Sequence, residues 1–250
     1  LKAPEETMPD DPDRWRRTVA GIMRNLHDKF EFFRDHPFVP LLRRPKLTGW
    51  EYAMEYSQCT TAAQLVEDKQ LYDRHTAAAM LLTYGMMLDH LHEHDLLFVD
   101  HSLSAILVQK DGNDKWMRIC DYDLVSSEEE INDVVDGRRH FARECGHVSY
   151  ASAEQLDLER RLTKESEVES YALLVTHALT GKTLRDGIFT EDYQFDVLSE
   201  KREFPRELRE LLPRKVAETG VPVLHRRRDR SITLADVMES VRTSLLPESV

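Results

Sequence analysis

The sequence predicts an α+β protein in which a small, strand-bearing part precedes a larger, mostly helical part. Apolar residues recur with a helical period over Trp15–Phe33. A strand, a turn at 111–113 and a second strand are predicted over Ile106–Ile119. With 250 residues and 41% hydrophobic content, the chain can bury a substantial core, so we favour one folded unit over two independent domains.

The most informative segment of the chain is Leu88–Val108. It contains Leu91-His92, then Asp100, then the apolar run Ile106–Val108. This order resembles the helix end, catalytic loop and following strand of a protein kinase, with Asp100 at the position of the catalytic aspartate. The resemblance also identifies four changed positions, namely Phe98 for His, Val99 for Arg, Ser102 for Lys and Ala105 for Asn.

Three later segments follow the order of the same family. The letters Asp-Tyr-Asp at 121–123 resemble the metal-binding Asp-Phe-Gly motif, and Gly146–Glu154 resembles the end of an activation segment. Glu167–Gly181 resembles the central helix of the large lobe, with Glu167 replacing the Asp that begins it and Gly181 suited to end it. The shared order favours a protein-kinase-like fold, and the alternative is an unrelated helical domain with accidental matches.

Two acidic residues have structural roles implied by the resemblance. Glu154 stands where the family has an activation-segment glutamate that pairs with an arginine before the last helix, so we expect an ion pair with Arg230 or Arg228. Glu167 is expected to hold a structural position at the start of the central helix. Tyr122 is expected to pack as the phenylalanine of the family motif does.

The resemblance continues into a small lobe over 14–56, which we expect to be truncated. The segment 36–42 resembles the turn into its fourth strand, and 50–56 resembles its fifth strand. The proline-containing linker at 1–13 has room for neither the Gly-rich loop nor the lysine-bearing strand of the family, and the large lobe is expected over 57–250. The resemblance implies that ATP would contact Met54, Glu55, Ser57, Leu107 and Asp121.

The predicted chemistry depends on two aspartates. Asp100 would orient the substrate hydroxyl, and Asp121 would hold Mg²⁺ at the phosphates of ATP, with Asp123 as an additional candidate ligand. Ala105 removes a ligand for a second magnesium and Ser102 lacks the charge of the lysine, and each such loss lowers the rate by about 100 to 1,000-fold. We therefore predict a pseudokinase, a catalytically impaired domain that acts as a scaffold or regulatory protein-interaction module.

Two alternatives remain open. One is an active atypical Ser/Thr protein kinase that transfers phosphate from ATP, which the retention of Asp100 and Asp121 favours. The other is a purely structural subunit of a larger complex that binds no nucleotide.

Composition limits the partners and the compartment. The net charge of −12 disfavours nucleic acid, so we expect a protein partner or a larger complex. No apolar stretch approaches the ~20 residues of a membrane span. Three cysteines without metal-ligand spacing favour a reducing compartment such as the cytoplasm, with Cys120 as a buried thiol.

A pair of histidines also has metal-binding potential. His90 and His94 are spaced to share one face of a helix and could bind zinc together. We do not expect a metal there, because the resemblance gives His92 a structural role and no triad of carboxylates is spaced to complete a site.

Overall fold

The computed structural model describes residues 20–21, 24, 27–33, 42–43, 53–54, 59–68, 74–111, 114–135, 138–139, 147–156, 160–183, 212–219 and 231–246. The predicted linker at 1–13 lies outside these residues. The division of the chain at 14 and 57 therefore stays a prediction.

The described strands all lie before residue 140, and the described elements after it are all helical, a segregation typical of an α+β protein. In chain order they are α2 (Phe30–Phe33), β1 (Leu42–Arg43), β2 (Ala53–Met54), β3 (Thr60–Thr61), α3 (Ala62–Glu67), α4 (Arg74–Glu93), β4 (Leu96–Leu97), η1 (Leu103–Ala105), β5 (Ile106–Asp111), β6 (Asp114–Ile119), η2 (Tyr122–Leu124), β7 (Ser126–Ser127), α5 (Glu128–Asn132), β8 (Val134–Val135), β9 (Arg138–Arg139), η4 (Val148–Tyr150), α6 (Ala153–Leu156), α7 (Lys164–Thr180), α10 (Arg214–Thr219) and α11 (Leu234–Leu245).

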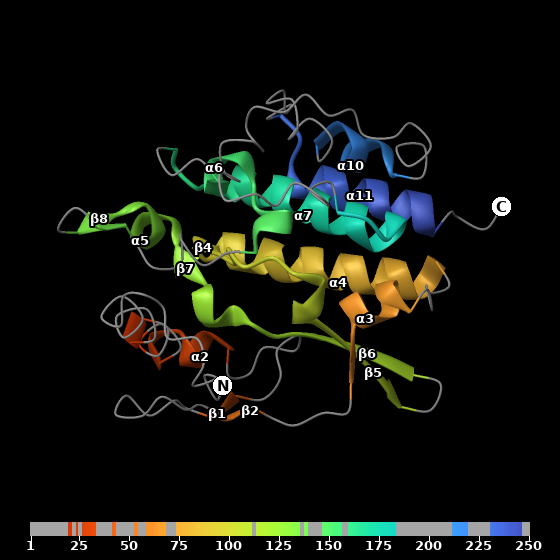
Figure 1. The fold of residues 1–250 in the computed structure, drawn as a ribbon, viewed down its shortest axis with the longest axis horizontal. Helices are drawn as coiled ribbons and strands as arrows, with labels where there is room; N and C mark the ends of the chain where they lie inside the picture. Colours follow the sequence, from red (N-terminus) through yellow and green to blue (C-terminus); the bar gives the residue numbers. More distant parts are fainter. Residues whose placement is uncertain are drawn as a thin grey trace.

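The larger part is built on helices α4, α7 and α11, with α7 and α11 on one side of α4 and the β5–β6 hairpin on the other (Figure 1). Tyr84 in α4 and Tyr171 in α7 are fully buried, and their stacked rings lie 6.3 Å apart. The Tyr171 hydroxyl donates to the carbonyl oxygen of Leu81 at 2.9 Å. A Cβ on Gly85 would lie only 2.8 Å from Cγ of Met238, so glycine permits the close approach of α11 to α4.

Helix α7 confirms the predicted central helix and its end. Gly181 adopts a left-handed φ of 67°, and its N–H donates to the carbonyl oxygen of His177 at 2.8 Å, as a helix-terminating glycine does. The start differs from the prediction, because the helix begins at Lys164 rather than at Glu167. Thr163 begins the helix earlier, with its N–H donating to Oγ of Ser166 at 3.1 Å, so Glu167 lies inside the helix rather than at its first residue.

The strands confirm the predicted hairpin. β5 and β6 pair antiparallel in a register that ends at Asp111 opposite Asp114, which leaves room for the predicted tight turn. β3 adds to the same sheet, with Thr61 opposite Leu107. Cys120, which follows β6, is 7% exposed, and burial raises the pKa of its thiol, so the predicted buried thiol is confirmed.

The small lobe is described in part, and its described parts agree with the prediction. β1 and β2 pair antiparallel, with Leu42 opposite Met54, where the sequence predicts the fourth and fifth strands of the lobe. Residues 20–21, 24 and 27–28 are helical before α2, within the helix predicted over Trp15–Phe33. The ring of Phe33 in α2 stacks on Tyr122 of η2 at 4.5 Å, so α2 contacts the region of the predicted site.

Candidate functional site

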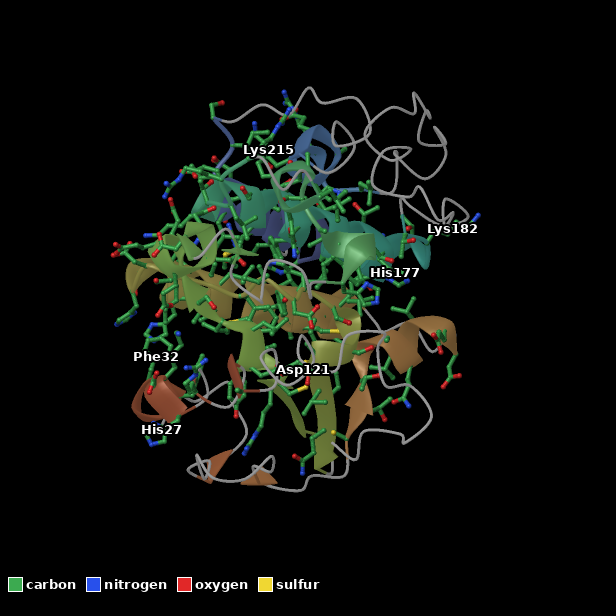
Figure 2. The ribbon with its side chains drawn as sticks, turned by 60° about the vertical axis from the view of Figure 1, so that its left-hand side comes forward. His27, Phe32, Asp121, His177, Lys182 and Lys215 are labelled. Atoms are coloured by element: carbon green, nitrogen blue, oxygen red, sulfur yellow. The ribbon has the colours of Figure 1, made fainter. Side chains whose placement is uncertain are left out.

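The candidate site lies where the segment between β4 and β5 meets the segment after β6. Asp100 lies between β4 and η1, and Asp121 immediately precedes η2. Figure 2 places Asp121 between the helical part and the β5–β6 hairpin. The sequence-predicted catalytic and metal-binding aspartates are therefore brought to one region.

Glu167 of α7 fixes the backbone just before Asp100. Its Oε1 accepts hydrogen bonds from the N–H groups of Phe98 at 2.7 Å and Val99 at 2.8 Å, and from Nε2 of His101 at 3.0 Å. Its Oε2 accepts from Nε2 of His92 at 2.9 Å. We call these five residues the Glu167 cluster. These contacts agree with the structural role predicted for Glu167, because its one carboxylate links the catalytic loop to the central helix.

The protonation of Glu167 follows from these contacts. Burial alone disfavours the charged carboxylate, but the hydrogen bonds from His101 and His92 outweigh it and lower the pKa of Glu167 to about 2. A buried carboxylate with several donors remains ionised because each donor stabilises the charged form. The cluster therefore contains a permanent negative charge at neutral pH.

Val99 shows why the loop needs such an anchor. Its φ is 65°, a left-handed conformation that is strained for a β-branched residue. Besides the Glu167 bond to its N–H, its carbonyl oxygen accepts from Nε2 of Gln155 at 3.2 Å. These two hydrogen bonds stabilise the strained backbone at Val99, the residue directly before Asp100.

His101 extends the cluster to α4, and sequence reasoning missed it. Its Nε2 donates to Glu167, and its Nδ1 forms a hydrogen bond with the Tyr84 hydroxyl at 3.0 Å. Burial, together with the negative charge of Glu167, raises the pKa of Tyr84, so its hydroxyl stays protonated at neutral pH. The available signal was its place directly after Asp100 in a loop whose family histidine is replaced by Phe98.

Asp100 is half-buried and makes a structural contact. Its Oδ1 accepts from the N–H of His147 at 2.8 Å, at the end of the predicted activation segment. Burial raises the pKa of Asp100 and the charge of Asp121 raises it further, while the bond from His147 lowers it. The carboxylate thus joins the catalytic loop to the activation segment.

Two of the four changed positions of the loop, Ser102 and Ala105, also have structural roles. Oγ of Ser102 accepts from the N–H of Ser104 at 3.0 Å, which caps the short helix η1. Ala105 is fully buried, and its carbonyl oxygen accepts from the N–H of Cys120 at 2.8 Å. Neither side chain offers a charge, and the methyl group of Ala105 offers no metal ligand.

Asp121 and Asp123 flank Tyr122, whose stacking on Phe33 confirms its predicted packing role. Asp121 has a left-handed φ of 61° and is exposed, yet the partial burial of its carboxyl still raises its pKa. Burial raises the pKa of Asp123 to about 6, and the charges of Asp121 and Asp100 contribute to the rise. We call Asp100, Asp121 and Asp123 the aspartate group.

The aspartate group has the hard oxygen donors that Mg²⁺ prefers. Its carboxylates repel one another, and a divalent cation would relieve that repulsion. Among the described residues, however, these three do not form a set of ligand atoms within 4.8 Å of one another. They suit the common arrangement in which one or two carboxylates and the phosphates of a nucleotide share the ion.

The predicted adenine contacts are described in part. Met54 lies in β2, while Glu55 and Ser57 lie outside the described residues. Leu107 in β5 is half-buried and packs against the main core. The nucleotide contacts of these residues stay predictions.

Glu154, the predicted activation-segment glutamate, lies within the described residues, but the two arginines predicted to pair with it do not. Glu154 in α6 is 7% exposed, a burial that suits a structural ion pair. Arg228 and Arg230 lie outside the described residues, so the pairing stays a prediction.

Comparison with known proteins agrees with this geometry. Residues 48–238 match the protein kinase domain family. Since the match covers most of the chain, the protein belongs to this family, and the predicted protein-kinase-like fold is confirmed.

A solved structure agrees in fold. It is a chain of the crystal structure of the yeast RNA Pol II CTD kinase CTDK-1 complex, which is similar with a TM-score of 0.61 and 14% sequence identity, covering 94% of this chain and 81% of that chain. No curated protein matches the sequence. Among the described residues, no helix is both long and apolar enough to cross a membrane.

Proposed function

We propose that this chain is a catalytically impaired protein-kinase-like domain that acts as a scaffold or regulatory protein-interaction module. The observation that carries the proposal is the environment of Ser102 and Ala105. The first caps η1 and the second is buried in the core. Both positions, which supply charge and a metal ligand in an active kinase, serve the fold here.

Electrostatics supports the same proposal. Phosphoryl transfer needs positive charge around the phosphates as negative charge develops on them. The aspartate group instead gathers negative charge, and burial raises the pKa of each member. Two lost electrostatic groups at about 100 to 1,000-fold each leave little turnover, even if the losses are not additive.

The partner of such a module is proposed to be a protein. The similar solved structure belongs to a kinase complex, and the acidic net charge of −12 disfavours nucleic acid as the alternative. A reducing compartment such as the cytoplasm is proposed on the cysteine pattern, and Cys59 and Cys120 are free thiols.

An active atypical kinase is the second candidate, and one observation favours it. Asp121 remains exposed at the junction of the two parts, and Asp100 lies near enough to contribute to the pKa of Asp123 alongside it. This arrangement would allow one Mg²⁺ to bridge Asp121 and the phosphates of ATP. Phosphoryl transfer would then proceed slowly, with Asp100 orienting the hydroxyl.

A phosphotransfer assay separates the two candidates. The wild-type chain and Asp100→Asn are incubated with labelled ATP, Mg²⁺ or Mn²⁺ and basic, acidic and hydroxyl-rich peptide substrates, and autophosphorylation is followed in parallel. We expect equal, background-level incorporation for both proteins. Incorporation that is at least about 100-fold higher in the wild type, the loss typical of one electrostatic group, would establish the active kinase instead.

The scaffold role needs a measurement in cells. In cells that lack the protein, the Asp100→Asn variant, which keeps Asp121 and so any nucleotide binding, is expected to restore function as well as the wild type does. If Asp100→Asn is folded and abundant but fails to restore function, the scaffold proposal is wrong. Thermal unfolding with ATP and Mg²⁺ then distinguishes a nucleotide-binding scaffold from one without nucleotide, because a ligand at 100 times its Kd adds about 2.7 kcal/mol.

A further inference from the structure

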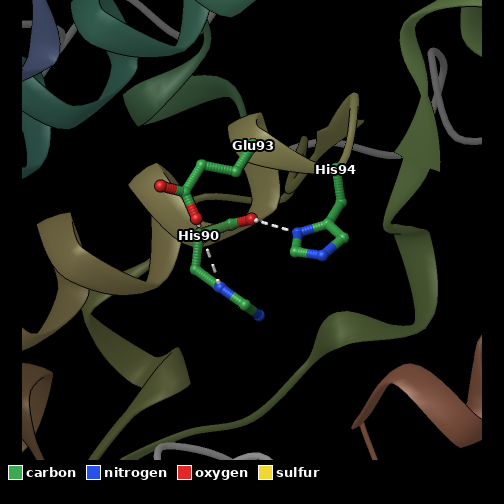
Figure 3. A group of neighbouring side chains, drawn as sticks. All are labelled: His90, Glu93 and His94. Atoms are coloured by element: carbon green, nitrogen blue, oxygen red, sulfur yellow. Dashed lines mark hydrogen bonds and ion pairs between the residues drawn. The ribbon is translucent and has the colours of Figure 1, made fainter.

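Three side chains that could bind a metal ion lie together at the last turn of α4 and the residue that follows it. His90, Glu93 and His94 lie together there (Figure 3), at the i, i+3 and i+4 spacing that places side chains side by side on a helix. A ring nitrogen of each histidine and a carboxylate oxygen of Glu93 all lie within 4.8 Å of one another. Among the residues that the structure describes, this is the one group of three that meets that geometry.

We propose that His90, Glu93 and His94 bind a divalent transition-metal ion of the zinc type, with water in the fourth coordination position. Two imidazoles and one carboxylate are a recognised ligand set for zinc, and an exposed set of three protein ligands keeps a position open. Sequence reasoning considered the two histidines and rejected them for lack of carboxylates. It missed Glu93, whose position next to His94 supplies the third ligand.

The spacing of two of the ligands already suits one ion. Nδ1 of His90 lies 3.7 Å from Oε2 of Glu93. Two ligands bound tetrahedrally at about 2.0–2.1 Å would lie about 3.3 Å apart. A small rotation of the exposed Glu93 side chain therefore brings both atoms to the distance that a shared metal requires.

His94 is held in the tautomer that a metal needs. Its Nδ1 lies 2.9 Å from the carbonyl oxygen of His90, and because a carbonyl can only accept, Nδ1 must carry the proton. The lone pair of the neutral ring is then on Nε2. Metal-binding histidines commonly donate their second ring nitrogen to a backbone carbonyl in this way, which fixes the ring for coordination.

The position on the helix also favours a cation. His90, Glu93 and His94 lie at the C-terminal end of α4, where the carbonyl groups and the helix dipole give a negative potential. Glu93 adds a full negative charge. The nearby Asp95 forms an ion pair with Lys164, in which Nζ of Lys164 lies 2.6 Å from Oδ1 of Asp95. Asp95 therefore does not compete for the metal ion.

The ion would act on the contact between the two parts of the molecule. Phe32 of α2 stacks on the His90 ring at 5.2 Å and meets the His94 ring edge-on at 5.0 Å. The two histidine rings are themselves 4.7 Å apart. Binding both rings to one metal would fix the surface on which Phe32 packs, and so hold α2 against the end of α4.

Metal titration of the full chain, produced without a histidine tag, tests the site. Zn²⁺ binding is measured by calorimetry, and Co²⁺ is used as a probe because a four-coordinate site gives intense visible absorption. We expect one ion per chain in the wild type. His90→Ala, Glu93→Gln and His94→Ala should each weaken binding by at least the 10 to 100-fold typical of losing even an outer partner of a metal site.

His75→Ala is the matched control, since His75 is an exposed histidine near the other end of α4. It should leave the affinity unchanged. If the three ligand variants bind Zn²⁺ as tightly as the wild type, or if the wild type shows no saturable binding, the proposed site is wrong.

Hydrogen exchange tests the link to α2. Zn²⁺ should slow amide exchange at 30–33 in the wild type and leave it unchanged in His94→Ala. If Zn²⁺ binds the three ligands but exchange in α2 does not change, the metal site stands and the proposed hold on α2 is wrong.

Discussion

Glu167 and the aspartate group lie within the same site and differ in how burial and hydrogen bonds affect their pKa values. Glu167 accepts hydrogen bonds from Phe98, Val99, His101 and His92, and its pKa falls to about 2. Each member of the aspartate group has its pKa raised, chiefly by burial, and that of Asp123 reaches about 6. The hydrogen bonds to Glu167 outweigh the effect of its burial on its pKa, whereas burial is the larger effect for each of the three aspartates.

This difference shows that the fold of a kinase and its chemistry depend on different charges in the same site. The fold depends on a buried negative charge that organises the catalytic loop, and the chain keeps that charge and supplies His101 as an additional donor. The chemistry depends on cations near the aspartates, and the chain replaces the corresponding loop positions with Ser102 and Ala105. The hydrogen bonds to Glu167 therefore serve the fold, whereas Ser102 and Ala105 bring no positive charge to the aspartate group.

The largest expected effect comes from removing the paired charge. Glu167→Gln should lower the free energy of unfolding by about 3 to 5 kcal/mol, because a buried, hydrogen-bonded charge is lost and the amide of Gln presents a donor to groups that already donate. Denaturant unfolding at neutral pH measures the change. Glu129→Gln is the control at an exposed position of α5, and it should change stability by no more than about 0.5 kcal/mol.

The pH dependence gives a second measure of the same variant. Since the folded pKa of Glu167 lies near 2, below its ordinary value of 4.5, its stabilisation is present above pH 4.5 and is lost as pH falls towards 2. The difference between wild type and Glu167→Gln should therefore shrink over that range. A constant difference from pH 6 to pH 2 would contradict the pairing.

Asp123 is expected to affect the pH dependence of stability in the opposite direction to Glu167. With a folded pKa of about 6 against an ordinary 3.8, Asp123 is destabilising once it ionises, and the loss grows as pH rises from about 4 to above 6. Asp123→Asn should therefore raise stability by about 3 kcal/mol at pH 8, at about 1.36 kcal/mol for each unit by which the pKa is raised, and change it little at pH 4. Thermal unfolding at both values measures this, and an equal gain at both would show that charge is not the cause.

The fold and the site were predictable from the sequence to different extents. Asp100, Asp121 and Gly181 keep family letters at family spacing, so their places could be predicted from the order of motifs. The role of His101 could not be predicted in this way, because it depends on hydrogen bonds to Glu167 and Tyr84. These two residues lie in α7 and α4 and meet only when the two helices pack. Glu93 was missed for a different reason, since an exposed glutamate on a helix is ordinarily a solvated charge.

A smaller effect tests whether the Glu167 cluster acts as one unit. Tyr84→Phe removes the hydroxyl that forms a hydrogen bond with His101 and should lower stability by about 1 kcal/mol, the net contribution of one hydrogen bond. Combined with Glu167→Gln it should cost less than the sum of the two changes, because both act through His101. A double-mutant cycle measures the coupling, which we expect to be at least about 0.5 kcal/mol. Strict additivity would show that the cluster is not connected through this ring.

The smallest effect is expected at the residue that an active kinase needs most. Asn at position 100 keeps a carbonyl oxygen that can accept from the N–H of His147, as Oδ1 of Asp100 does at 2.8 Å. It also removes a charge whose pKa is raised by burial and by Asp121, so the loss of charge offsets any weakening of the hydrogen bond. Asp100→Asn should therefore change the free energy of unfolding by less than about 1 kcal/mol at neutral pH, with any gain in stability larger at pH 8 than at pH 4.

Asp100→Ala is the informative comparison, because it removes the acceptor as well as the charge and should be the less stable of the two variants. If Asp100→Asn were as destabilising as Glu167→Gln, the two groups of carboxylates would not differ in the way that their hydrogen bonds indicate.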